Sequence, residues 1–176
     1  LPGESLVAFL SDGAFEEQRG SDWAPRWWRA EDCGYAIPVM ILNGRRIEQR
    51  TQIVQEGGAN WLAEDVRHNG FAPLIVDGRD PAAIAWAVIE AEAALRTFSA
   101  QPDKHYPARL PYVIAETEKG FGFPGAGTNA AHNLPLPGCP CCDEATRDLF
   151  NASASTLFVP EQELSEAITR LTNHQQ

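Results

Sequence analysis

The chain has 176 residues, of which 44% are hydrophobic and 22% charged, and its formal net charge is −10 at pH 7. This size and balance are typical of one soluble globular domain with a substantial core, so residues 1–176 are interpreted as a single domain. The sequence shows no basic stripe, no export signal and no apolar run near the ~20 residues of a membrane helix, so we expect a cytoplasmic protein without nucleic-acid or membrane partners.

Four apolar runs predict the strands of one sheet. Each run is apolar throughout rather than alternating, which is typical of parallel strands that are covered on both faces. The runs are residues 5–10, 36–42, 71–76 and 111–116. Helical patterns separate them over residues 14–30, 51–69 and 81–98. This alternation predicts an α/β fold with an open, mostly parallel sheet and helices on both faces.

Two of these helical segments carry more specific signals. Trp23 and Trp27 are four residues apart in the first segment, which suggests one helical face, although Pro25 interrupts it. In the third segment Pro81 follows Asp80, a combination that favours the start of a helix.

The last third of the chain is organised differently. Residues 118–141 form a long Gly/Pro-rich loop, and a loop of this length inside a domain is often functional. Its residues 120–125 match the Gly-x-Gly-x-x-Gly pattern of dinucleotide-binding proteins. Several prolines follow where a helix should begin, so we interpret the segment as a Gly-rich lid instead. Residues 142–176 are interpreted as a helical tail, with helices over 142–150 and 160–173.

Polar residues follow every predicted strand at its carboxyl end, where open α/β sheets bind their ligands. They are Asp12-Gly13, Asn43-Gly44, Asp77-Gly78 and Thr117-Glu118. Asp12 and Asn43 both offer hard oxygen donors, which suit an Mg²⁺ ion that also carries a diphosphate. Asp-Gly and Asn-Gly are also common turn dipeptides, so the spacing by itself leaves two simple turns as the alternative.

Cysteine and histidine give weaker signals. Cys139, Cys141 and Cys142 lie close together, and the fourth cysteine is Cys33. A structural zinc site usually takes two separated pairs of ligands, so we favour surface thiols in a reducing compartment. His132 lies in the Gly-rich loop, either as a surface residue or, at a strand-end site, as an acid, a base or a phosphate contact.

Four motifs in unbroken order add a resemblance to these observations. Residues 9–13 (Phe-Leu-Ser-Asp-Gly) are followed about thirty residues later by residues 42–47 (Leu-Asn-Gly-Arg-Arg-Ile). Residues 70–81 and 116–136 follow, the last from Glu-Thr-Glu-Lys-Gly to His-Asn-Leu-Pro-Leu. Over residues 5–137 the chain resembles the thiamine-diphosphate-dependent phosphoketolase/transketolase family, with the first two motifs matching its Gly-Asp-Gly…Asn signature. The second and fourth motifs are most similar to phosphoketolases.

The resemblance implies a site for thiamine diphosphate and Mg²⁺. Asp12 and Asn43 would hold the metal ion together with the backbone carbonyl of Arg45, and Gly13 would lie against the diphosphate. The implied fold is part of a thiamine-diphosphate-binding domain.

The resemblance also implies a chemistry. His132 would reach the substrate or cofactor channel, and Glu17 would match an acidic residue of the family's proton-relay network. In such enzymes the cofactor attacks the carbonyl of a ketose phosphate and acts as electron sink while a C–C bond breaks. The implied substrates are xylulose 5-phosphate or fructose 6-phosphate, and transketolase-type ketol transfer is the alternative, because Gly-Phe-Gly at 120–122 is also close to transketolase.

Two departures from the family pattern shape the expectation. Ser11 replaces the first glycine of the signature. The family's upstream His-Gly phosphate motif and its pyrimidine-binding domain are not found in this sequence. We therefore expect a portion of a larger enzyme that is inactive alone and works with the pyrimidine-binding domain, in a homodimer. A non-catalytic α/β module is the alternative.

Overall fold

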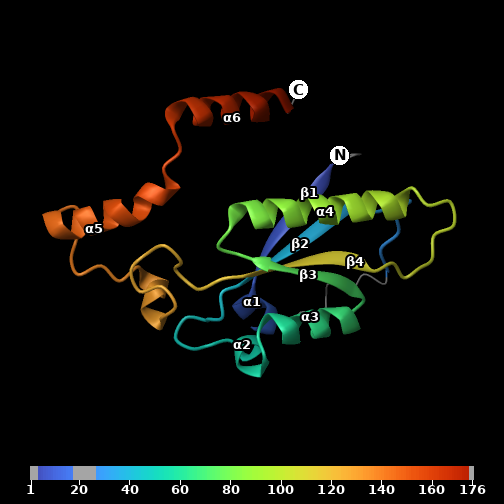
Figure 1. Cartoon of the computed structure of the whole chain (residues 1–176), viewed down its shortest axis with the longest axis horizontal. Helices are drawn as coiled ribbons and strands as arrows, with labels where there is room; N and C mark the ends of the chain where they lie inside the picture. The colour runs from blue at the N-terminus through green and yellow to red at the C-terminus, as the bar shows by residue number, and fades with distance from the viewer. Residues whose placement is uncertain (1–3, 18–26, 175–176) are drawn as a thin grey trace.

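The computed structural model describes residues 4–17 and 27–174, and its centre is a four-stranded sheet (Figure 1). The strands are β1 (Ser5–Ser11), β2 (Tyr35–Leu42), β3 (Phe71–Asp77) and β4 (Leu110–Glu116). They lie in the order β1-β2-β4-β3, and every pairing is parallel. The predicted open α/β sheet is therefore confirmed.

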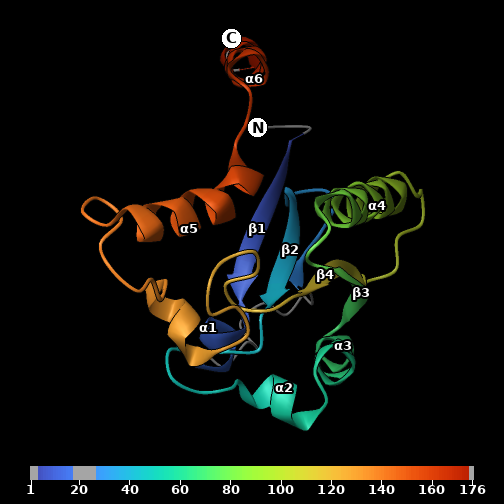
Figure 2. The ribbon, with the colours of Figure 1, turned by 60° about the vertical axis from the view of Figure 1, so that its left-hand side comes forward.

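Helices cover both faces of this sheet. The helices are α1 (Asp12–Glu17), α2 (Gln52–Glu56), α3 (Ala59–His68), α4 (Pro81–Ser99), α5 (Glu144–Ala154) and α6 (Glu161–His174). Helix α4 lies on one face and helices α2 and α3 lie on the other, as Figures 1 and 2 show. The crossovers from β2 to β3 and from β3 to β4 thus supply the helices that cover the two faces of the sheet.

Side chains of the central strands alternate between two apolar layers. On β2, Val39 packs in the layer that contains Ala91 of α4, whereas Met40 packs in the layer that contains Leu62 of α3. The period of two residues in a strand explains this alternation, because successive side chains point to opposite faces. Strands β2 and β4 are therefore apolar throughout because both of their faces are covered, as predicted.

Strand β1 differs from that prediction. Its side chains Leu6 and Phe9 are 63% and 65% exposed. Because β1 lies at the edge of the sheet, α4 and α3 cover it less than they cover β2 and β4. An apolar run in the sequence indicates a strand, but it does not distinguish an edge strand from a central one.

The predicted helix starts and breaks are confirmed where the local signals were strong. The carboxylate of Asp80 accepts a hydrogen bond from the backbone N–H of Ala82 at 2.9 Å, and Pro81 occupies the first position of α4. The predicted segment 51–69 forms two helices, with the break at Gly57 and Gly58.

The structure tests the first predicted helical segment only at its two ends. Helix α1 covers Asp12–Glu17, and residues 18–26, with Trp23 and Pro25, lie outside the described residues. The prediction was wrong for residues 28–30, which are not helical. The Trp28 ring instead packs against Phe98, and its indole N–H donates a hydrogen bond to the backbone of Gly34 at 3.1 Å.

The C-terminal helices α5 and α6 extend away from the sheet (Figures 1 and 2). Leu164, Ile168 and Leu171 of α6 are all exposed. In the part of the chain that the structure describes, we find no helix with the length and hydropathy needed to cross a membrane.

Tyr112 on β4 leads to a prediction about the core. Its side chain is 1% exposed and meets the ring of Phe71 edge-on at 5.2 Å, and its hydroxyl has no hydrogen-bond partner among the described residues. Burial also raises the pKa of this phenol. Because a buried hydroxyl without a partner is destabilising, we expect Tyr112→Phe to raise the free energy of unfolding by about 1 kcal/mol in urea titrations. A loss of stability would show that the hydroxyl has a partner.

Candidate functional site

Asp12 occupies the carboxyl end of β1 and begins helix α1, where it is completely buried. One carboxylate oxygen accepts a hydrogen bond from the N–H of Gly13 at 2.9 Å, and the other accepts from the N–H of Gly44 at 2.7 Å. The hydroxyl of Thr51 lies 3.4 Å from the second oxygen. Asp12 thus ties the turn after β2 to the end of the neighbouring strand.

The charge of Asp12 is poorly compensated in this environment. The groups that donate to its carboxylate are two amides and one hydroxyl, all of them uncharged. Burial is the main cause that raises the pKa of Asp12, and the nearby carboxylate of Glu16 adds to it. A cation bound here would remove this cost, because an opposite charge favours the ionised form.

Asn43 and Arg45 form the turn that Asp12 holds. The side-chain oxygen of Asn43 accepts a hydrogen bond from the N–H of Arg45 at 3.0 Å, which makes an Asx-type turn. Between them Gly44 has a φ of +77°, and an added Cβ would lie 2.9 Å from a methyl group of Val54. Glycine is therefore required here both by the backbone conformation and by the close approach of α2.

Gly13 is buried and lies close to the same turn. A Cβ placed on Gly13 would lie 3.5 Å from Cγ of Arg46 and 3.9 Å from the carbonyl oxygen of Arg45. These are ordinary van der Waals distances, so the space would accept a methyl group. The structure therefore brings together Asp12, Gly13, Asn43 and Arg45, the four residues predicted to hold a metal-bound diphosphate.

Glu16 and Glu17 are placed very differently on α1. The carboxylate of Glu16 accepts a hydrogen bond from the N–H of Ile53 at 2.6 Å and pairs with Arg46 at 2.6 Å. These bonds lower the pKa of Glu16 although its partial burial opposes them. Glu17 has 67% of its side chain exposed and lies 4.0 Å from Arg46. Glu16 thus contacts helix α2 and Arg46, whereas the predicted residue Glu17 is mostly exposed.

The Gly/Pro-rich loop packs against the turn after β2. The only helical piece within residues 118–141, all of which the structure describes, is the short 3-10 helix η3 (Asn129–Asn133). The side-chain oxygen of Asn129 accepts a hydrogen bond from Arg45 at 2.6 Å, and its amide donates to the carbonyl of Glu48. No α-helix follows the Gly-x-Gly-x-x-Gly pattern within residues 120–141, all of which the structure describes, which is consistent with rejecting the dinucleotide-binding interpretation.

Lys119 links this loop to the site and positions His132. Its ammonium group donates a hydrogen bond to the carbonyl oxygen of Arg46 at 2.7 Å and lies 3.3 Å from Nδ1 of His132. The His132 side chain is exposed. With its proton on Nε2, the imidazole accepts from Lys119 at Nδ1 and presents an N–H donor on its other side.

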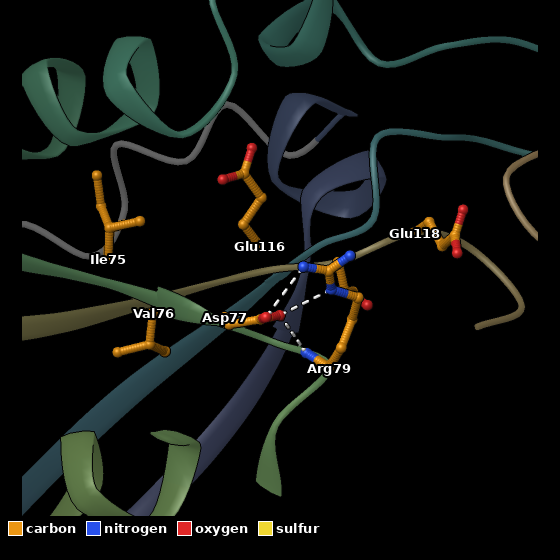
Figure 3. A pocket seen from close by; sticks show the side chains of 7 residues that line it. Ile75, Val76, Asp77, Arg79, Glu116 and Glu118 are labelled. Atoms are coloured by element: carbon orange, nitrogen blue, oxygen red, sulfur yellow. Dashed lines mark hydrogen bonds and ion pairs between the residues drawn. The ribbon is translucent and has the colours of Figure 1, made fainter. Parts of the chain in front are cut away.

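An open pocket of about 470 Å³ lies further along the same edge, at the ends of β3 and β4 (Figure 3). Asp77 and Arg79 face each other there, and Arg79 holds the pKa of Asp77 at about 2. Glu116 and Glu118 also line the pocket, so carboxylates outnumber the single guanidinium. This pocket does not suit a diphosphate, in contrast to the edge beside Asp12.

The structure also shows what the sequence interpretation missed. The hydroxyl of Thr51 donates to Asp12, and the charge of Glu16 contributes to the raised pKa of Asp12. Neither residue was predicted as a site residue. The spacing of Asp12 and Glu16, four residues apart at the start of a helix, would have placed both on one helical face. No cluster of three or more His, Cys, Asp or Glu side chains able to hold a metal ion occurs within residues 4–17 and 27–174. A site beside Asp12 would therefore rely on amide and carbonyl oxygens as well.

The candidate site of this α/β protein thus consists of the buried carboxylate of Asp12 after β1 and the turn that follows the adjacent parallel strand β2.

No protein-family model matches the sequence. A probable phosphoketolase of Rhodopseudomonas palustris (strain BisB5) is 30% identical over 118 residues, which cover 58% of this chain and 15% of that protein. A probable phosphoketolase of Rhodopirellula baltica (strain DSM 10527 / NCIMB 13988 / SH1) is 28% identical over 148 residues, which cover 76% of this chain and 18% of that protein.

These similarities support a phosphoketolase-like relationship for the chain. The chain spans less than a fifth of the length of these curated relatives. The matched portion covers more than half of this chain in both comparisons.

Proposed function

We propose that this chain is the Mg²⁺–thiamine-diphosphate-binding portion of a phosphoketolase-like enzyme. The enzyme would cleave a C–C bond of ketose phosphates such as xylulose 5-phosphate or fructose 6-phosphate. The observation that carries the proposal is the buried carboxylate of Asp12, which is held only by uncharged donors and bridges to the turn after β2. The two phosphoketolase relatives support the same assignment.

The residues beside Asp12 fit an Mg²⁺ ion that carries thiamine diphosphate. Asp12, Asn43 and the carbonyl of Arg45 supply hard oxygens of the kind that Mg²⁺ prefers, and the space beside Gly13 would admit an oxygen of the diphosphate. Bound thiamine diphosphate would supply the electron sink for cleavage of the C–C bond. Asp12 would stay ionised beside the cation and thereby keep the turn of residues 43–45 in place.

Lys119 and His132 would act on the substrate side of this site. Lys119 fixes the ring of His132 through Nδ1 and anchors the Gly-rich loop on the carbonyl of Arg46. His132 would then contact the sugar phosphate through Nε2. Arg46 is neutralised by Glu16, so its role would be to shape the wall of the site rather than to bind phosphate.

The partners follow from the same proposal. The pyrimidine-binding domain of the whole enzyme would complete the cofactor site, and a homodimer would bring the two halves together. Transketolase-type transfer remains the second candidate because of the Gly-Phe-Gly segment at residues 120–122. Formation of acetyl phosphate from xylulose 5-phosphate and phosphate by the full-length protein would favour phosphoketolase, whereas transfer to an aldose would favour transketolase.

Gly13→Ala tests the proposed site without disturbing the fold. The new methyl group has room and Gly13 lies in α1, so stability should stay equal or rise by up to about 1 kcal/mol. The same methyl group fills the space proposed for the diphosphate. We therefore expect titration calorimetry of the full-length protein with Mg²⁺ and thiamine diphosphate to show at least about tenfold weaker binding.

Gly34→Ala is the matched control, because a Cβ there has no neighbour within 4 Å among the described residues. We expect it to leave both stability and affinity unchanged. Equal affinity of Gly13→Ala and the unmodified protein would place the cofactor elsewhere. An absence of binding by the unmodified protein would favour a non-catalytic α/β module.

A further inference from the structure

The turn before helix α5 carries three cysteines that the proposed function does not use. Residues 139–142 read Cys-Pro-Cys-Cys, and all three thiols are free and exposed. The first and last of them have the Cys-x-x-Cys spacing that lowers thiol pKa values and supports disulfide exchange in other proteins. The turn leads directly into α5, whose N-cap Asp143 accepts from the N–H of Thr146 at 2.8 Å.

The backbone of this turn brings Cys139 and Cys142 together. The N–H of Cys142 donates to the carbonyl of Cys139 at 3.0 Å, and the N–H of Asp143 donates to the same oxygen at 2.9 Å. The first of these bonds closes a β-turn, in which the terminal Cα atoms are less than about 7 Å apart. Disulfides join Cα atoms about 4.4–6.8 Å apart, so a turn of this kind is compatible with a Cys139–Cys142 bond.

The surroundings of Cys139 favour its thiolate form. The donors around its sulfur are the backbone N–H groups of Cys141 and Cys142 and the thiols of the same two residues. Together these donors lower the pKa of Cys139. In contrast, the thiol of Cys33 donates to the carboxylate of Asp32 at 3.2 Å. Cys139 is therefore the cysteine that is best prepared for nucleophilic attack.

We propose that Cys139 and Cys142 form a thiol–disulfide exchange site that reacts with low-molecular-weight disulfides. The thiolate of Cys139 attacks one sulfur of the disulfide RSSR, the S–S bond breaks, and one RS⁻ leaves. The sulfur of Cys142 then attacks Cys139, releasing its proton and the second RS⁻. The two cysteines lose two electrons and the small disulfide gains them, so the products are a Cys139–Cys142 disulfide and two thiols.

The structure selects Cys142 rather than Cys141 as the second cysteine. Cys142 closes the turn through the hydrogen bond to Cys139, whereas Cys141 lies within the turn. Cys141→Ser is consequently a matched control that removes one thiol from the same exposed segment. Cys33 is a second control, because it is exposed like the others but lies outside the turn.

The test treats the fully reduced protein with glutathione disulfide and follows it by intact-mass and peptide mass spectrometry. We expect the unmodified protein and Cys141→Ser to lose two hydrogens and to yield a peptide linked through Cys139 and Cys142. Cys142→Ser should instead retain one glutathionyl group on Cys139. Cys139→Ser should retain little modification at this turn under the same conditions.

A measurement on the unmodified protein keeps the proposal testable if a variant fails to fold. In a limited reaction with iodoacetamide, Cys139 should be alkylated about tenfold faster than Cys33, because the thiolate is the reacting species. Equal rates at Cys139 and Cys33 would overturn the proposal. A disulfide that forms through Cys141 equally well in Cys142→Ser would also overturn it.

Discussion

Replacing Asp12 with alanine is expected to lower the free energy of unfolding by about 2–4 kcal/mol, because two buried N–H groups would lose their acceptor. Those donors are the amides of Gly13 and Gly44, which lie 2.9 and 2.7 Å from the carboxylate. The same change removes the proposed metal ligand, so Mg²⁺-dependent binding of thiamine diphosphate should be lost. Urea titration measures the first effect, and calorimetry of the full-length protein measures the second.

Asp12→Asn separates the charge of the side chain from its size. Asparagine keeps one acceptor, so this variant should be more stable than Asp12→Ala while binding Mg²⁺ as poorly. Retention of metal-dependent binding in both Asp12→Ala and Asp12→Asn would exclude Asp12 as the ligand.

The pH dependence of stability provides a further comparison between Asp12→Asn and the unmodified protein. Because burial raises the pKa of Asp12 in the fold, the unfolded chain ionises first as the pH rises. The contribution of Asp12 to stability is thus largest below its ordinary pKa and falls until the pH passes the raised value. Asp12→Asn lacks this component, so its stability relative to the unmodified protein should improve across that window, and Mg²⁺ should reverse the trend.

Gly78→Ala is expected to destabilise the fold by about 2–3 kcal/mol, because the added methyl group would collide with backbone atoms. A Cβ at Gly78 would lie 2.8 Å from the carbonyl carbon of Ala115 and 3.0 Å from the carbonyl oxygen of Glu116. The N–H of Gly78 also donates to that oxygen at 2.8 Å. Relief of the collision requires the end of β3 to move away from β4, which weakens this bond.

Gly34→Ala again serves as the control for this substitution, with an expected change within about 0.5 kcal/mol. Thermal unfolding of both variants measures the difference. Because Asp77 pairs with Arg79 next to Gly78, nuclear magnetic resonance titration of Asp77 should report the displacement. Equal stability of Gly78→Ala and Gly34→Ala would show that the contact between β3 and β4 relaxes without cost.

The fold could be predicted from the sequence where local chemistry and burial agree. Apolar runs identified all four strands, and Asp80-Pro81 located the start of α4 correctly. The order of the strands could not be predicted, because the apolar runs of β1 and β4 look alike although only β4 is central. Residues 28–30 were also misassigned, because the long-range packing of Trp28 against Phe98 outweighs local helical preference.

The candidate site could be predicted only as far as strand ends determine it. Asp12 and Asn43 were placed on one edge because parallel strands end on the same side, and the structure brings them to the same turn. The different surroundings of Glu16 and Glu17 depend on the direction of α1 relative to Arg46. Packing decides which of two neighbouring residues on a short helix is buried, so the sequence motif alone could not distinguish Glu16 from Glu17.

The strand order has a consequence for how the protein is assembled. Strand β4 lies between β2 and β3, although it is the last of the four to be synthesised. The two earlier strands therefore share no ladder until residues 110–116 enter the gap between them. Lys119 follows this strand directly and contacts Arg46. Pairing of β4 with β2 and β3 therefore also brings Lys119 to the turn after β2. Folding of the sheet and assembly of the candidate site thus depend on the same long-range strand pairing.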